Sequence, residues 1–105
     1  LSSHSKALSN SYYCFIILLH GILRGKRLKI VKELKKKGIG TSVYYPGPIP
    51  MLAFYKKKYS SLLINFKNAN EISQNSIAFP VGPHISNFEV DYIVKNFKDI
   101  IGNIK

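Results

Sequence analysis

The chain has 105 residues, and its hydrophobic fraction of 46% excludes intrinsic disorder and is typical of one small globular domain. Its net charge of +11 would suit a nucleic-acid-binding protein, but only Arg24 and Arg27 are arginines, and the other 14 of the 16 cationic residues are lysines. Arginine is the usual reader of phosphates and bases. We therefore attribute the charge to a composition biased toward lysine, isoleucine and asparagine.

The beginning of the chain predicts a tail rather than a folded element. Residues 1–11 are polar and serine-rich, so we expect a tail or incoming linker there and a folded domain over residues 12–105. Because Leu1 is the first residue and Met51 the only methionine, we expect a fragment, or one domain of something longer.

Residues 12–19 form a continuous aromatic and β-branched run, which predicts a strand buried on both faces or nearly so. The apolar run ends at residue 23 and is too short for a membrane span, which needs about 20 residues. Cys14 lies in this run and predicts a small core residue. As the single cysteine it cannot form an internal disulfide, which favours a cytoplasmic location.

After a turn at residues 21–25, residues 26–37 predict the clearest helix. Leu28, Val31 and Leu34 recur at helical spacing and predict its inward face, and Glu33 and Lys37 have the spacing of a favourable ion pair. Gly38 predicts a left-handed stop, after which Ile39 folds back on the last turn.

The middle of the chain predicts a second strand at residues 41–45, which prolines at positions 46, 48 and 50 then end. A short helical turn follows at residues 52–59, and residues 66–73 predict a further helix with Ala69 and Ile72 facing inward. Residues 76–79 predict a third strand, stopped by Pro80.

The last helix begins with a capping box, in which Ser86 is the cap and Glu89 follows three residues later. Its predicted apolar stripe consists of Val90, Ile93, Phe97, Ile100, Ile101 and Ile104. The order β-α-β-α-α-β-α predicts a two-layer α+β small domain, with helices packed on a sheet of about three strands.

The candidates for chemistry are few. The five acidic residues form no carboxylate pair, His4, His20 and His84 are too scattered for a metal site, and no glycine-rich phosphate loop is present. The two proline turns, at residues 46–50 and 80–83, predict loops that present side chains at a site.

Several side chains near these turns have two interpretations each. Tyr44 and Tyr55 contact a ligand or belong to the core, and strand alternation favours the core for Tyr45 if Tyr44 is exposed. His84 either contacts a ligand or makes local hydrogen bonds in its turn.

Four motifs, in this order, resemble the C-terminal domain of DegT/StrS-type sugar aminotransferases. They are Gly-Ile-Gly-Thr-Ser-Val-Tyr-Tyr-Pro-Gly-Pro-Ile-Pro (38–50), Asn-Ala-Asn-Glu-Ile-Ser (68–73), Ile-Ala-Phe-Pro-Val-Gly-Pro-His-Ile-Ser (77–86) and Asp-Tyr-Ile-Val (91–94). The resemblance covers residues 12–101. It implies the small domain of a fold-type I, pyridoxal-phosphate enzyme of the aspartate-aminotransferase fold.

The resemblance further implies an enzyme that moves an amino group from an amino acid such as glutamate to the keto sugar of a nucleotide sugar. In that family the cofactor lysine lies in a larger N-terminal domain, and the complete enzyme is expected to be a homodimer. The small domain closes the cleft, and the substrate-binding positions implied here are Tyr44, Pro48, Pro50, Tyr55 and His84. Many members have a histidine where this chain has Pro50, which puts that contact in doubt.

We expect no catalytic, cofactor-binding or metal-binding residue in this chain. Lys6, in Ser-His-Ser-Lys, superficially resembles the family's Schiff-base lysine motif, but it lies in the polar tail, where no buried pocket would lower its pKa. The chain by itself is therefore expected to be inactive. The alternatives are a small basic nucleic-acid-binding module, using residues 35–37 and 56–58, and a regulatory or vestigial fragment without a ligand.

Overall fold

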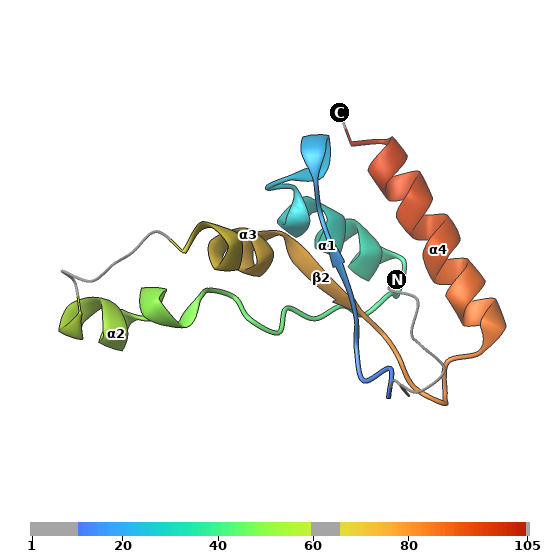
Figure 1. Ribbon diagram of the computed structural model, residues 1–105. Coiled ribbons are helices and arrows are strands. Elements are labelled where there is room, and N and C mark those ends of the chain that lie inside the picture. Colours follow the sequence, from blue (N-terminus) through green and yellow to red (C-terminus); the bar gives the residue numbers. More distant parts are fainter. Residues whose placement is uncertain (1–10, 60–65, 105) are drawn as a thin grey trace, which may run out of the picture.

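The computed structural model describes residues 11–59 and 66–104, so the predicted tail, apart from Ser11, lies outside the described residues. The predicted α+β class is confirmed (Figure 1). No helix in the described ranges is long and apolar enough to cross a membrane. The elements in chain order are β1 (Phe15–Leu18), η1 (Gly21–Leu23), α1 (Arg27–Lys36), η2 (Ile49–Met51), α2 (Ala53–Lys58), α3 (Lys67–Asn75), β2 (Ser76–Phe79) and α4 (Asn87–Gly102).

The sheet has two strands in the described residues instead of about three. β1 and β2 pair antiparallel, with Phe15 opposite Phe79. The predicted strand at residues 41–45 contributes a single bridge, in which Ser42 and Ala78 exchange hydrogen bonds of 3.0 and 2.9 Å. Two features prevent a longer ladder. The next carbonyl on that edge of β2, that of Ser76, faces the Arg27 guanidinium at 3.5 Å, and Pro46 has no N–H to donate.

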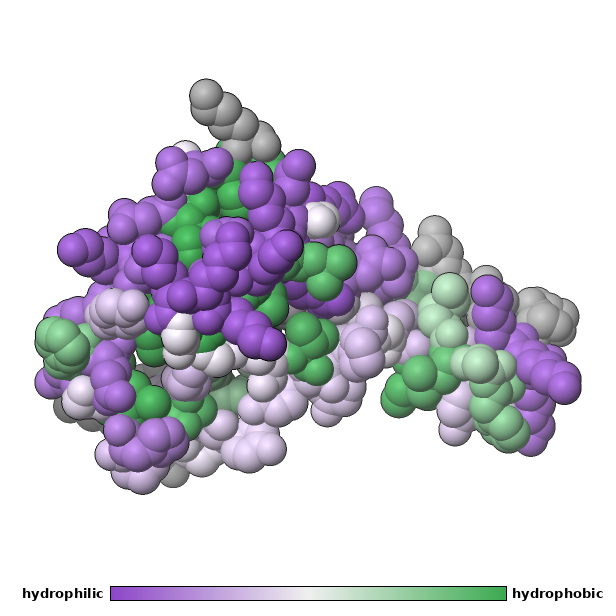
Figure 2. Space-filling model, turned by 180° about the vertical axis from the view of Figure 1, so that it is seen from behind, coloured by the Kyte–Doolittle hydropathy of each residue, from purple (hydrophilic) through white to green (hydrophobic). Residues whose placement is uncertain are grey.

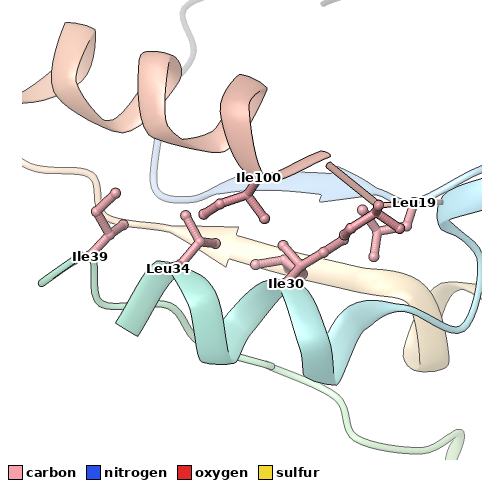
Figure 3. Close-up of a cluster of buried hydrophobic side chains, with 7 residues drawn as sticks. Leu19, Ile30, Leu34, Ile39 and Ile100 are labelled. Atoms are coloured by element: carbon pink, nitrogen blue, oxygen red, sulfur yellow. The ribbon is translucent and has the colours of Figure 1, made fainter. Parts of the chain in front are cut away.

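The core lies between one face of the sheet and the helices α1 and α4 (Figure 3). On α1 the buried side chains are Ile30 and Leu34, whereas the predicted Leu28 is 82% exposed. The predicted inward face is thus confirmed for Leu34 and for Val31, which packs against the core, and wrong for Leu28, because spacing alone does not tell which of two adjacent apolar rows meets the sheet. The buried core cluster consists of Leu19, Ile30, Leu34, Ile39, Ile77, Ile100 and Ile104.

The predicted stripe of α4 is confirmed over most of its length. Ile100 and Ile104 are buried, and Ile93, Phe97 and Ile101 pack against the core. Val90, one turn from the start of the helix, is 46% exposed and does not join them. The Tyr92 hydroxyl also donates to the Lys37 carbonyl, at 3.1 Å, and so ties α4 to the end of α1.

The end of α1 has the predicted geometry. Gly38 has a φ of 74°, and hydrogen bonds of 3.0 Å run from the Gly38 and Ile39 amides to the carbonyls of Lys35 and Leu34. This is the Schellman arrangement, and it buries Ile39. The predicted partner of Glu33 was wrong, however. Glu33 pairs with Lys36 at 2.7 Å, and this hydrogen bond lowers the pKa of the Glu33 carboxyl.

Polar contacts, rather than the predicted apolar ones, hold α3. Ala69 and Ile72 are exposed, and the buried residues are Ser73 and Asn75. The Asn75 side chain accepts from the Gly25 amide at 2.8 Å and donates to the Glu71 carbonyl at 3.1 Å. We call these two bonds the Asn75 clasp. Arg27 adds a hydrogen bond to the Ser73 carbonyl, and Arg24 pairs with Glu71 at 3.1 Å.

The first strand is less buried than the sequence predicts. Phe15 and Ile16 are 46% and 45% exposed, and Cys14 is exposed rather than a core residue. β1 is an edge strand in the described sheet, and α1 and α4 cover one face only, so an apolar run does not by itself bury both sides.

The segment of η2, α2 and Tyr59, residues 49–59, stands apart from the rest of the molecule, and we call it the arm (Figure 1). Its extension contributes to a radius of gyration of 16.7 Å. A compact chain of this length would have about 13 Å.

Removal of the Asn75 clasp should destabilise the chain. We expect Asn75→Ala to lower the free energy of unfolding by about 1–3 kcal/mol, because the buried Asn75 side chain loses two part-buried hydrogen bonds, each contributing about 0.5–1.5 kcal/mol. Urea denaturation followed by circular dichroism measures this. The control is Gln74→Ala on the same helix, which removes only an exposed hydrogen bond to Asn70 and should change stability by no more than about 0.5 kcal/mol. Equal effects of the two changes would contradict the role of the clasp.

The capping box of α4 predicts a pH dependence. Both predicted bonds are present, and hydrogen bonds from the Ser86 amide and hydroxyl lower the pKa of Glu89. Since its folded pKa lies below its unfolded one, the stabilisation is complete above the unfolded pKa and disappears as pH falls through the folded pKa.

Glu89→Gln should therefore lower the urea midpoint at about pH 7 and have a smaller effect at an acidic pH below the lowered pKa of Glu89, where the native carboxyl is protonated. Asp91→Asn is the control, because it removes a carboxylate from α4 outside the capping box. A Glu89→Gln effect of the same size at both pH values would contradict the prediction.

Candidate functional site

The two proline turns leave the sheet in opposite directions. Because the Ser42–Ala78 bridge is antiparallel, the chain after Ser42 runs toward the start of β2, whereas the chain after Phe79 runs away from its end. The first turn leads to the arm and the second to α4 (Figure 1). The structure therefore places Tyr44, Pro48, Pro50 and Tyr55 along one segment and His84 at the opposite end of β2.

The tyrosines of the first segment are accessible. Tyr44 is 47% and Tyr45 72% exposed. The assignment of Tyr45 to the core was wrong, because it assumed a regular strand whose residues alternate between two faces, and only the Ser42 bridge forms. Pro48 and Pro50 are half-buried, and Pro50 lies in η2, where its fixed φ suits the first turn.

Tyr55 lies in a small aromatic cluster on the arm. Its ring stacks on that of Tyr59, with centroids 6.3 Å apart, and Phe54 meets it edge-on at 5.3 Å. The Lys58 ammonium lies 5.4 Å from the Tyr59 ring centroid and 5.8 Å from that of Phe54. An apolar patch bearing a cation results, and it favours apolar and anionic contacts.

His84 occupies a turn that depends on glycine. Gly82 has a φ of 151°, and its carbonyl accepts from the Ile85 amide at 3.1 Å. A Cβ added at Gly82 would lie 2.6 Å from the His84 ring, so the ring packs directly on the glycine backbone. The exposed His84 also contributes to the lowered pKa of Glu89, after the hydrogen bonds from Ser86.

The described residues do not fit a pyridoxal-phosphate attachment site. Every lysine of the described ranges is exposed, whereas an imine-forming lysine needs a buried pocket. Lys6 lies outside the described residues. Those ranges also hold no group of three or more histidine, cysteine, aspartate or glutamate side chains that could hold a metal ion. The described tyrosines, His84 and the arm offer groups for binding and orientation.

An open groove of about 590 Å³ lies between β1 and α4, and the sequence analysis did not anticipate it. Phe15, Ile17 and Phe79 form one wall, and Val94 and Phe97 are among the residues of the other. The sequence analysis missed the groove for the same reason that it assigned Cys14 to the core, because exposed and buried apolar residues look alike in a sequence. With Lys98 among the few polar residues of its lining, the groove suits an apolar occupant and no acid–base chemistry.

Comparison with known proteins identifies the family. The model of the DegT/DnrJ/EryC1/StrS aminotransferase family matches residues 1–98, which is nearly the whole chain. The chain belongs to this family. The resemblance that the four sequence motifs carry is thereby confirmed.

Curated relatives and solved structures agree with this assignment. The chain is 29% identical over 97 residues to the uncharacterized protein MJ1066 of Methanocaldococcus jannaschii, covering 91% of this chain and 25% of the relative. It is 26% identical over 81 residues to the spore coat polysaccharide biosynthesis protein SpsC of Bacillus subtilis, covering 77% and 20%. The chain thus spans about a quarter or less of the length of the curated relatives it matches.

Two solved structures superpose on nearly all of the chain. The PMP-form of Spr1654 from Streptococcus pneumoniae, a candidate sugar aminotransferase, has a TM-score of 0.81 at 29% identity and covers 100% of this chain and 26% of its own. PseC of Helicobacter pylori, an aminotransferase of pseudoaminic acid biosynthesis, has a TM-score of 0.74 at 21% identity, covering 85% and 23%. The latter likeness shows the fold alone.

The glycine of the second turn should be hard to replace. We expect Gly82→Ala to cost about 1–3 kcal/mol of stability, since its φ is unfavourable for other residues, and to displace the His84 ring. Urea denaturation and the NMR shifts of the His84 ring measure the two effects. Gly47→Ala in the first turn is the control, because a Cβ there meets nothing within 4 Å and should leave stability almost unchanged. A neutral Gly82→Ala with an unmoved His84 ring would refute the prediction.

Proposed function

We propose that residues 12–105 form the small domain of a pyridoxal-phosphate-dependent nucleotide-sugar aminotransferase. The family match over residues 1–98 carries this proposal. The second support is that Spr1654 superposes on the whole chain with only 26% of its own length, so in that protein the same fold is one part of a larger enzyme. The catalytic lysine and the cofactor then belong to a separate, larger portion of the aminotransferase.

In this proposal the small domain orients the sugar nucleotide and does not break bonds. The accessible Tyr44 and Tyr55 offer hydroxyl groups for hydrogen bonding, and Pro48 and Pro50 hold the segment between them in a fixed path. His84, at the opposite end of β2, would contact another part of the substrate or of the protein. Fixing the substrate in a reactive orientation is itself a large contribution to rate.

The proposal includes an amino-acid donor such as glutamate and a homodimeric complete enzyme. A cytoplasmic location belongs to it as well, because Cys14 is exposed and free, and free thiols persist in reducing compartments. The nucleic-acid alternative receives no support. Lys36 is paired with Glu33, and with Lys35 it lies at the end of α1 where cations stabilise a helix.

The proposal predicts activity only in the presence of the larger portion. A full-length polypeptide in which this chain replaces the matched quarter of Spr1654 should transfer the amino group of glutamate to a keto sugar in a panel of nucleotide sugars. The chain by itself, with pyridoxal phosphate, should show no turnover and no specific lysine adduct after borohydride reduction and mass spectrometry.

Tyr44→Phe in that polypeptide should raise KM more than it lowers kcat, since the hydroxyl is assigned to substrate binding. Tyr45→Phe is the matched control. Specific amino transfer by the isolated chain, or identical kinetics for Tyr44→Phe and the unchanged polypeptide across the panel, would refute the respective part of the proposal.

A further inference from the structure

Local contacts hold the arm, residues 49–59, in its fold. Its backbone hydrogen bonds outside α2 itself join residues 48 and 51, 49 and 52, 52 and 56, and 55 and 59. Its ring contacts join Phe54, Tyr55 and Tyr59, and the Lys58 ammonium lies over two of those rings. These contacts fold the arm against itself, and none of the buried core residues in the described ranges belongs to it.

The arm exposes six large apolar or aromatic side chains. Figure 2 shows hydrophobic residues gathered on this projecting lobe, with hydrophilic ones beside them. The exposed fractions are 62% for Ile49, 49% for Met51, 48% for Leu52, 66% for Phe54, 40% for Tyr55 and 42% for Tyr59. Exposed apolar residues that are contiguous, unlike scattered ones, mark an interaction surface.

Contacts within the arm contribute little stability to its short helix. α2 has six residues, and isolated helices shorter than about 12–15 residues are marginal in water. The match to Spr1654 nevertheless covers 100% of this chain in the PMP-form and 99% in the apo-form, each with a TM-score of 0.81. In that protein about three quarters of the polypeptide is additional to the matched part.

The charge of the arm distinguishes between two partners that could cover it, a second copy of this chain and the additional part of the larger protein. Lys56, Lys57 and Lys58 occupy the last turn of α2, and the chain carries a net charge of +11. A second copy of the chain would bring two such clusters together, and like charges in an interface cost free energy. A surface with an apolar centre and an acidic rim matches both the aromatic cluster and the lysines.

We propose that the arm docks on the larger, catalytic portion of the aminotransferase, at an apolar surface with an acidic rim. Phe54 is the anchor, since it is the most exposed of the arm's large apolar side chains and central aromatic anchors contribute most of the energy of such contacts. Lys56–Lys58 pair with the acidic rim. This inference rests on the proposed function, because the larger portion is part of that proposal.

Hydrogen–deuterium exchange tests the docking. In the chain by itself, the amides of α2 should exchange almost as fast as in an unfolded peptide, while those of β2 and the middle of α4 stay protected. In the polypeptide in which this chain replaces the matched quarter of Spr1654, the α2 amides should gain protection of about tenfold or more. Protection of α2 in the isolated monomer would overturn the proposal, and this result can be obtained even if the grafted polypeptide fails to fold.

A substitution gives a second, independent measurement. Phe54→Asp should lower the Tm of the grafted polypeptide by about 2–4 °C or more and leave that of the isolated chain unchanged. The matched control is Phe88→Asp at the start of α4, because Phe88 is 79% exposed and lies off the arm. Equal effects of the two changes in the grafted polypeptide would overturn the proposal.

The remaining outcomes separate this inference from the proposed function. Sedimentation of the isolated chain should show a monomer, and a dimer that Phe54→Asp dissolves would assign the arm to a second copy instead. A grafted polypeptide that protects the arm but transfers no amino group would refute the proposed function and keep the docking. One that is active with an unprotected arm would refute the docking alone.

Discussion

The antiparallel pairing of β2 on both of its edges determines the shape of the molecule. β1 pairs with one edge and Ser42 with the other, and the helices α1 and α4 pack on one face. Antiparallel neighbours separate in opposite directions once pairing stops. The Ser42 bridge therefore sends the first proline segment away from the second.

A second constraint is polar. α3 precedes β2 directly, and its position is set by the Asn75 clasp, by Arg27 and by the Arg24–Glu71 pair rather than by apolar burial. The same Arg27 faces the Ser76 carbonyl and so occupies the edge of β2 that a third strand would need. The hydrogen bonds of Arg27 thus have two effects. They fix the position of α3, and they leave the first proline segment unpaired with β2, so that it runs on toward the arm.

The features that could be predicted from the sequence are those that neighbouring residues decide. The capping box at Ser86 and the stop at Gly38 need only local hydrogen bonds, and both are present. Most of the failures concern which face of a helix or strand meets the core. Leu28 against Ile30, the exposed Cys14, and Ile72 in α3 depend on which face meets the core. The candidate site shows the same division, since the position of Tyr44 and Tyr55 near the first proline turn is local information, whereas the separation of His84 from them follows from the antiparallel bridge.

The exposed apolar surface is the feature that connects fold with function. A 105-residue chain has little stability to spare, yet this one leaves both the groove beside α4 and the aromatic arm uncovered in the described residues. Both surfaces are mainly apolar. Both are explained if the domain is shaped by what it covers: the exposed residues are then interior residues of a larger enzyme, and the segment between Tyr44 and Tyr55, which the proposed function assigns to substrate binding, is held at one end by the Ser42 bridge and at the other by the seated arm.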